Sequence, residues 1–132
     1  MSTAFVIFYR NMNLGHLNSP TRAMLESALR QAGASSARSF QTNGTVLIEA
    51  GDAAPREVVH RAAPRLLTVS GYDDAACVRP IDQLAAILDR DPFAGVGDER
   101  TYRETFTFFD GAGDPLRLYR VKTPSLPHRA AV

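Results

Sequence analysis

The sequence has little of several features that mark specialised classes of protein. Cys77 is the only cysteine among 132 residues, so no internal disulfide can form and the reducing cytoplasm is the expected location. No apolar run approaches the roughly 18 residues that a membrane span needs. The first residues lack the basic segment of a secretory signal. We therefore expect a cytoplasmic protein with no membrane partner.

An excess of charge of one sign is also missing. Fifteen basic residues oppose 14 acidic ones, and the net charge of +1 argues against a nucleic-acid partner. Lys122 is the only lysine, and arginine binds phosphate or carboxylate with two parallel hydrogen bonds better than lysine does. A GC-rich genome would also explain the many Arg and Ala residues. His16, His60 and His128 lie far apart without metal-ligand spacing, so we expect no metal and no cofactor.

What is present is typical of one globular domain, with 45% hydrophobic and 22% charged residues. The continuous apolar run 4–9 predicts a buried central strand. We predict the strands and helices from the spacing of apolar residues, and their ends and turns from the positions of Gly, Pro and Asn. The predicted order after strand 4–9 is a helix from Ser19-Pro20 to Gly33, a hairpin over 36–49, a helix over 53–70 and a strand over 75–79.

Local signals within these elements make sharper predictions. Ser19 and Asp52 are expected to cap the two helices, and Pro64 to kink or break the second one. Asn43-Gly44 predicts a two-residue type I′ turn. The expected inner residues of helix 53–70 are Val59, Ala62, Ala63 and Leu66, and those of helix 82–90 are Leu84, Ala85, Ile87 and Leu88.

The fold class is α+β, a ferredoxin-like βαββαβ sandwich over residues 4–79 with strands 4–9 and 45–49 adjacent at the sheet centre. Residues 80–122 extend it by a helix and a C-terminal β-hairpin over 102–122, which completes a single domain over 1–122. Residues 123–132 are expected to form a loose tail. The second face of the sheet is covered either by this extension or by a second subunit of a homodimer.

Residues 10–19, between the first strand and the first helix, are the candidate ligand-binding site. Free amides at a helix start favour anions, and an Arg side chain can bind phosphate or carboxylate. The alternative is that the Arg and Asn side chains satisfy the backbone of their own loop. The candidate ligand-binding residues are Arg10, Asn11, Asn13, His16 and Ser19.

The remaining cysteine and acidic side chains do not indicate a catalytic site. Cys77 lies in an apolar strand and is expected to be a buried, inert thiol. The acidic pairs, among them Asp73-Asp74, are expected to be solvated loop and helix ends. The residues favour a module that binds a small anionic metabolite, without catalysis. The alternatives are an enzyme on a phosphorylated or nucleotide substrate, and a structural homodimeric interaction module.

Two sequence blocks are similar to those of a known family. The block Arg10-Asn11-Met12-Asn13-Leu14-Gly15 resembles the R-G-I-N-V-G block of the bacterial domain of unknown function 1697 family. Residues 39–48 are similar to its T-Y-I-Q-S-G-N-V-V-F block. Its later V-R, L and P-F landmarks are matched in order by Val78-Arg79, Leu84 and Pro92-Phe93.

The resemblance covers residues 4–93 and implies an α+β fold with ferredoxin-like elements, but no activity. The chain departs from the family pattern at Asn11, Asn43 and Thr45, where the family has Gly, Ser and Asn. It also lacks the R-N-W-like block of the family's C-terminal part. The chain therefore resembles a shortened, divergent member.

Overall fold

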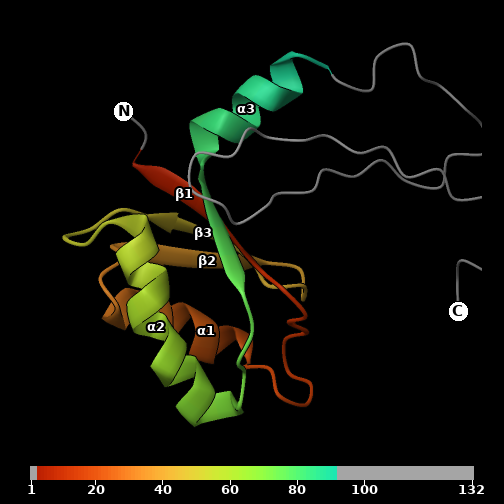
Figure 1. Ribbon diagram of the computed structural model, residues 1–132, viewed down its shortest axis with the longest axis vertical. Coiled ribbons are helices and arrows are strands. Elements are labelled where there is room, and N and C mark those ends of the chain that lie inside the picture. Colours follow the sequence, from red (N-terminus) through yellow and green to blue (C-terminus); the bar gives the residue numbers. More distant parts are fainter. Residues whose placement is uncertain (1–2, 92–132) are drawn as a thin grey trace, which may run out of the picture. The chain divides into compact units, whose positions relative to one another are not determined.

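The computed structural model describes residues 3–91 as a mixed α+β arrangement (Figure 1). A four-stranded antiparallel sheet and three helices account for most of these residues. The predicted loop 93–100, hairpin 102–122 and tail 123–132 lie outside the described residues. The elements in chain order are β1 (Ala4–Tyr9), α1 (Arg22–Gln31), β2 (Ser36–Phe40), β3 (Thr45–Glu49), α2 (Pro55–Ser70), β4 (Ala76–Pro80) and α3 (Ile81–Asp89).

The sheet has the strand order β2-β3-β1-β4, with β1 and β3 at its centre. Ile7 of β1 lies opposite Val46 of β3, and Phe5 lies opposite Ile48. Ile7, Val46 and Ile48 are completely buried. The prediction that the two most apolar strands are neighbours at the sheet centre is confirmed.

Helices α1 and α2 pack on one face of this sheet, and the main core lies between the two layers (Figure 1). Leu25 and Leu29 of α1 are fully buried there. The inner face of α2 differs from the prediction by one position, because Val58 is fully buried whereas Ala63 is exposed. Leu66 and Ala62 are buried as predicted.

The helix starts differ from the predicted ones. Thr21 caps α1, with its hydroxyl accepting from the Met24 amide, so Ser19 does not cap this helix. Ala54 precedes α2 and makes no side-chain cap, so the prediction for Asp52 is wrong as well. Pro55, in the first turn of α2, has no amide proton to satisfy, which lowers the need for a cap.

The helix ends and the internal proline are partly as expected. Gly33 directly follows Ala32, the C-cap residue of α1, and Gly71 is the C-cap residue of α2. Both glycines have the positive φ expected of glycines that terminate helices. Helix α2 runs through Pro64 without a break. Thr68 donates a hydrogen bond to the Pro64 carbonyl (2.9 Å) one turn away, within the continuing helix.

The β2–β3 hairpin has a longer connection than predicted. Strand β2 ends at Phe40, which lies opposite Thr45, so the loop is the four residues 41–44. Positive φ occurs at Gln41 and Gly44 and not at Asn43, which excludes the type I′ turn. The reason lies outside the hairpin. The loop carbonyls of Thr42 and Gly44 accept hydrogen bonds from Leu14 and Tyr9, which hold the loop open.

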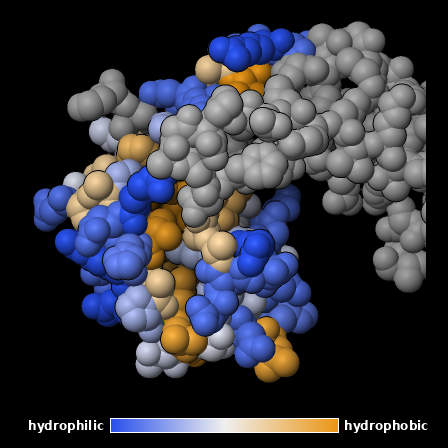
Figure 2. Space-filling view, viewed as in Figure 1, coloured by the Kyte–Doolittle hydropathy of each residue, from blue (hydrophilic) through white to orange (hydrophobic). Residues whose placement is uncertain are grey.

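The remaining surface of the described part is mostly hydrophilic on the face shown in Figure 2, where hydrophobic side chains form a narrow band between hydrophilic ones. None of the described helices is long and apolar enough to cross a membrane. In α3 only Ile87 is buried, whereas the predicted inner residue Leu88 is 65% exposed. What covers the second face of the sheet stays a prediction.

Candidate functional site

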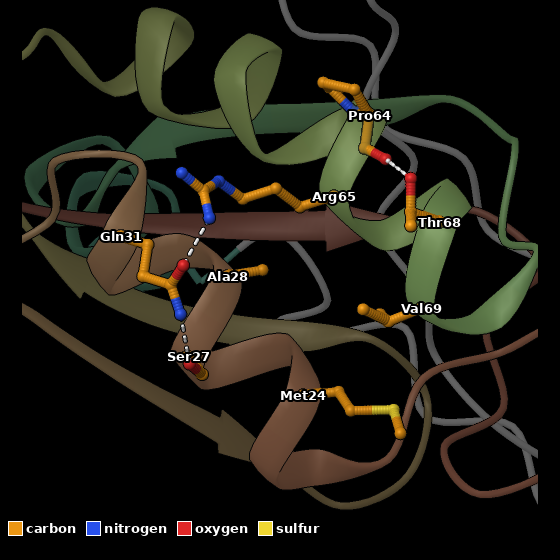
Figure 3. A pocket seen from close by; sticks show the side chains of 8 residues that line it. All are labelled: Met24, Ser27, Ala28, Gln31, Pro64, Arg65, Thr68 and Val69. Carbon is orange, nitrogen blue, oxygen red and sulfur yellow. Dashed lines mark hydrogen bonds between the residues drawn. The ribbon is translucent and has the colours of Figure 1, made fainter.

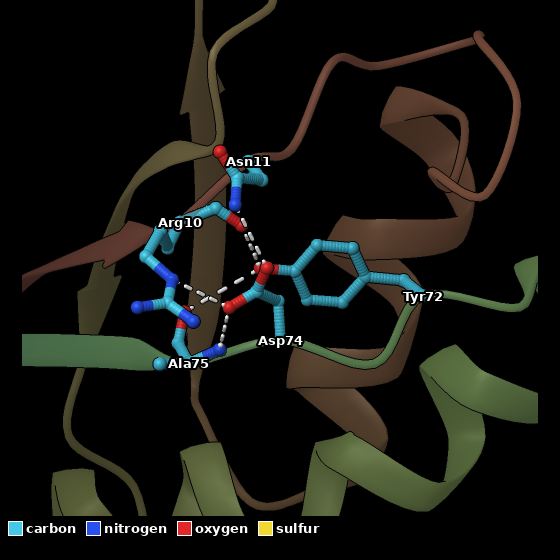
Figure 4. A network of polar contacts seen from close by, with 5 residues as sticks. All are labelled: Arg10, Asn11, Tyr72, Asp74 and Ala75. Carbon is cyan, nitrogen blue, oxygen red and sulfur yellow. Dashed lines mark hydrogen bonds and ion pairs between the residues drawn. The ribbon is translucent and has the colours of Figure 1, made fainter.

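The loop between β1 and α1 begins with a polar cluster, centred on the carboxylate of Asp74 (Figure 4). Oδ1 of Asp74 accepts from Arg10 Nε at 2.7 Å and from the Ala75 amide at 2.6 Å. Oδ2 accepts from Asn11 Nδ2 at 3.0 Å. We call these residues, with Tyr72, the Arg10–Asp74 cluster. It brings together two of the five predicted site residues.

The pairing of β1 with β4 creates this cluster. Tyr9 lies opposite Ala76, and the ladder continues one step further because the Arg10 amide donates to the Ala75 carbonyl at 2.9 Å. Asp74 therefore lies beside the start of the loop although it is 64 residues away in sequence. The prediction of a merely solvated Asp73-Asp74 pair is wrong for Asp74, which binds two side chains.

Hydrogen bonds lower the pKa of Asp74 below its ordinary value. The largest cause is the Ala75 amide, followed by the Asn11 amide and the Arg10 guanidinium, each of which favours the ionised carboxylate. The cluster therefore keeps a negative charge beside Arg10 throughout the neutral pH range. That charge fixes the direction of the guanidinium by holding its Nε.

Among the described residues, only Asp74 binds the Arg10 guanidinium, through Nε. Asp74 binds Nε, and the Arg10 side chain remains 70% exposed. Figure 4 draws no contact to either outer nitrogen. Arg10 is thus not a clamp for its own loop, which was the alternative interpretation. It is held by a side chain from the loop before the neighbouring strand β4 and stays largely exposed.

The second half of the loop forms a separate set of contacts. The Asn13 amide donates to the Ser19 hydroxyl at 3.0 Å, and the His16 amide donates to the Asn13 carbonyl at 3.0 Å. The Ser19 amide in turn donates to the His16 carbonyl. Asn13, His16 and Ser19 therefore shape a turn. The hydroxyl expected to cap a helix is used inside the loop instead, which explains the displaced cap.

No recorded contact joins these two halves. Within residues 3–91, the hydrogen bonds of His16 involve its backbone, and its side chain is linked to neither Arg10 nor Asn11. A pocket formed by described residues lies between α1 and α2, and none of the loop residues lines it. The described part of the chain therefore gives no pocket that Arg10, Asn13 and His16 line together.

Tyr72 connects the Arg10–Asp74 cluster to a second tyrosine, Tyr9. Tyr72 donates its hydroxyl to the Arg10 carbonyl at 2.5 Å and also approaches the Ala75 carbonyl at 3.4 Å. Its ring meets that of Tyr9 edge to face, with centroids 5.7 Å apart. The local sequence around Tyr72, just after the predicted helix 53–70, gives no sign of this contact. Knowledge of the β1–β4 register, which places Ala75 opposite Arg10, would have predicted that Tyr72 lies near Arg10.

The Tyr9 hydroxyl, in contrast, is buried without a hydrogen-bond partner in the described part of the chain. Burial is the main reason that the pKa of Tyr9 lies far above its ordinary value, and the neighbouring Tyr72 raises it further. Burial also raises the pKa of Tyr72, with the Asp74 charge as the second cause. Both phenols therefore stay neutral at all ordinary pH values.

This difference predicts opposite effects for two matched substitutions. Tyr9→Phe removes an unsatisfied buried hydroxyl, so the free energy of unfolding should rise by about 1 kcal/mol. Tyr72→Phe removes the bond to the Arg10 carbonyl, so the free energy of unfolding should fall by about 1 to 2 kcal/mol. Urea denaturation of both variants measures these changes. A loss of stability in Tyr9→Phe would show that the hydroxyl has a partner in solution.

Cysteine and metal chemistry add little to the site. Cys77 is half-buried in β4, whereas the sequence analysis expected a buried thiol. All five residues of β4, which lies at the edge of the described sheet, are half-buried. The described residues contain no group of three His, Cys, Asp or Glu side chains that could hold a metal ion.

The fold and site define a small α+β protein with an arginine held by a carboxylate at the end of its central strand. The family model for a protein of unknown function, DUF1697, matches residues 1–130. The chain belongs to this family. The match extends well beyond residues 4–93, on which the sequence resemblance rested. The chain matches no curated protein and no solved structure.

Proposed function

We propose that the protein is a binding module for a small anionic metabolite, held by the outer edge of the Arg10 guanidinium. One observation carries the proposal: Asp74 binds only Nε and orients a side chain that is 70% exposed. A guanidinium fixed in this way loses less conformational freedom when it forms two parallel bonds to phosphate or carboxylate. Asn11, Asn13, His16 and Ser19 complete the proposed site as the loop around it.

Thermal unfolding with inorganic phosphate tests the proposal. A ligand that binds only the folded state raises the melting temperature, and the gain grows with its concentration. Arg10→Ala should abolish the gain, and Arg10→Lys should reduce it because a lysine cannot form the paired bonds. Arg30→Ala is the matched control, since Arg30 is an exposed arginine of α1 away from the loop. It should leave the gain unchanged.

Two results would refute this function. The first is an unchanged melting temperature with phosphate or with a dicarboxylate such as malonate at millimolar concentration. The second is unfolding of Arg10→Ala without any ligand, which would make Arg10 a structural residue. Catalysis is not part of the proposal, because no recorded contact brings His16 to the Arg10–Asp74 cluster.

The proposal includes a ferredoxin-like topology, a single domain over residues 1–122 and a cytoplasmic location. The element order β1-α1-β2-β3-α2-β4 and the strand order β2-β3-β1-β4 support the topology, since the β2–β3 hairpin sets β3 beside β1. The single cysteine supports the location. A homodimer is the alternative cover for the second sheet face, and sedimentation equilibrium distinguishes it from a monomer.

A further inference from the structure

A groove between α1 and α2 lies on the side of the helices away from the sheet and has a volume of about 560 Å³. This is within the range of roughly 300–1,000 Å³ that pockets for small molecules occupy. Figure 3 shows its lining, four residues from each helix. The lining residues of this α1–α2 groove are Met24, Ser27, Ala28, Gln31, Pro64, Arg65, Thr68 and Val69.

The floor of the groove is apolar and incompletely covered. Met24 is 41% exposed and Val69 is 49% exposed, and Figure 3 shows both side chains in the space between the helices. Ala28 continues the apolar lining along α1 and is itself buried. An apolar group placed between Met24 and Val69 would remove these side chains from water, which is the usual driving force for binding in a preformed pocket.

The polar lining is largely satisfied within the groove. Gln31 accepts from Arg65 Nη1 through Oε1 and donates through Nε2 to the Ser27 hydroxyl at 2.8 Å. Thr68 donates its hydroxyl back to the Pro64 carbonyl of its own helix. These bonds leave the Arg65 guanidinium as the group in the lining that still has several donors to offer.

Arg65 differs from the two arginines that form ion pairs with described carboxylates. Arg10 is held by Asp74 and Arg61 by Glu57, so in both pairs a carboxylate balances the charge. The recorded partner of Arg65 is the neutral amide of Gln31. Because no described carboxylate forms an ion pair with Arg65, the described part of the groove presents one uncompensated positive charge beside an apolar floor.

We propose that the α1–α2 groove binds a monocarboxylate with an aliphatic or aromatic body. The carboxylate pairs with the free edge of Arg65, and the apolar body lies along Met24, Ala28 and Val69. A carboxylate carries one charge and matches one guanidinium with two parallel bonds. A phosphate monoester carries close to two charges at neutral pH, so it would lose more hydration than a carboxylate beside the apolar side chains of the floor. The site is separate from the Arg10–Asp74 cluster.

A titration with octanoate, with 1-octanol as the uncharged control of equal chain length, tests this proposal. The readout is the NMR signals of the Met24, Ala28 and Val69 methyl groups, compared with the core methyls of Val46 and Ile48. Octanoate should perturb the groove methyls and leave the core methyls unchanged. Octanol should bind about tenfold more weakly, since it lacks the charge-assisted bonds.

Three variants decide what carries the affinity. Arg65→Met keeps the length of the side chain and removes its charge, so the preference for octanoate over octanol should disappear. Met24→Glu should abolish octanoate binding by placing a carboxylate in the groove, and an acidic residue in the first turn of α1 is compatible with the helix. Arg30→Met removes an arginine of the same helix that does not line the groove, and both affinities should stay unchanged.

Equal binding of octanoate and octanol to the wild type would overturn the proposal, as would octanoate shifts confined to methyls outside the groove. Concentration-dependent self-association that shifts the same groove methyls without ligand would also overturn it, since a second copy would then occupy the groove. The two sites are distinguishable. Arg10→Ala should leave octanoate binding intact, and Arg65→Met should leave the phosphate effect intact, so each can fail alone.

Discussion

Gly44→Val should lower the free energy of unfolding by about 2 to 6 kcal/mol, since a strained φ and overpacking each cost about 1 to 3 kcal/mol. Gly44 has a φ of +78°, which a β-branched residue adopts only under strain. A Cβ atom there would also lie 2.9 Å from the Cβ atoms of both Tyr9 and Met12. These two residues flank Arg10, so the hairpin loop cannot move away without displacing the candidate site.

Gly15→Val is the matched control for this prediction. Gly15 has a nearly identical φ of +83°, but a Cβ atom at this position would meet nothing within 4 Å. Gly15→Val should therefore lower the free energy of unfolding only by the strain of the left-handed conformation, about 1 to 2 kcal/mol. Urea denaturation of the two variants separates backbone strain from packing. Equal losses would mean that the loop over residues 41–44 yields easily and does not support the site loop.

The sequence predicts the elements well because their signals are local. The apolar strands around Ile7 and Val46, the terminating glycines Gly33 and Gly71, and the helical spacing of Leu25 and Leu29 need no knowledge of distant residues. Each of these features lies within a few positions of the one predicted. The pairing of the two most apolar strands also follows, because only a central position buries both of their faces.

The details that the sequence does not predict depend on competition between distant partners. Ser19 has the right chemistry for a helix cap, but its hydroxyl accepts from Asn13 and Thr21 takes the cap. The residues 43–44 have the composition of a tight turn, but the amides of Tyr9, at the end of β1, and Leu14, in the β1–α1 loop, bind the hairpin loop and favour a longer connection. In both segments the local sequence allows more than one arrangement, and contacts with distant residues decide which arrangement forms.

In the candidate site too, the sequence predicts what depends on local signals and misses what depends on distant contacts. The sequence places Arg10 at the end of a buried strand, and the structure confirms that position. It does not identify Asp74 as the partner, because the carboxylate is brought there only by the β1–β4 pairing. Once the strand order is known, a continued register places Ala75 opposite Arg10 and makes the pairing foreseeable. The uncompensated charge of Arg65 depends on two helices meeting and has no local signal.

Arg22→Met should lower the free energy of unfolding by about 2 kcal/mol, in keeping with the loss of charge-assisted hydrogen bonds. Ser39 is buried in the edge strand β2, and its carbonyl and hydroxyl accept from Arg22 Nη1 at 2.6 and 2.7 Å. Arg22 Nη2 donates to the Gln41 carbonyl at 2.5 Å. A methionine fills similar volume but leaves the Ser39 carbonyl without this donor. Arg30→Met, the exposed control on the same helix, should change stability by less than about 0.5 kcal/mol.

Glu26 completes this contact from the other side and makes it sensitive to acid. Its Oε2 accepts from the Ser39 amide and hydroxyl, both at 2.9 Å, and the amide bond is the largest cause of a Glu26 pKa below the ordinary value. The stabilisation is therefore complete above the ordinary pKa of 4.5 and is lost as the pH falls through the lowered one. Glu26→Gln can still accept from Ser39 but cannot titrate. The urea midpoint of the wild type should consequently fall more steeply than that of Glu26→Gln between pH 6 and pH 3, and parallel profiles would show that Ser39 does not stabilise the charge.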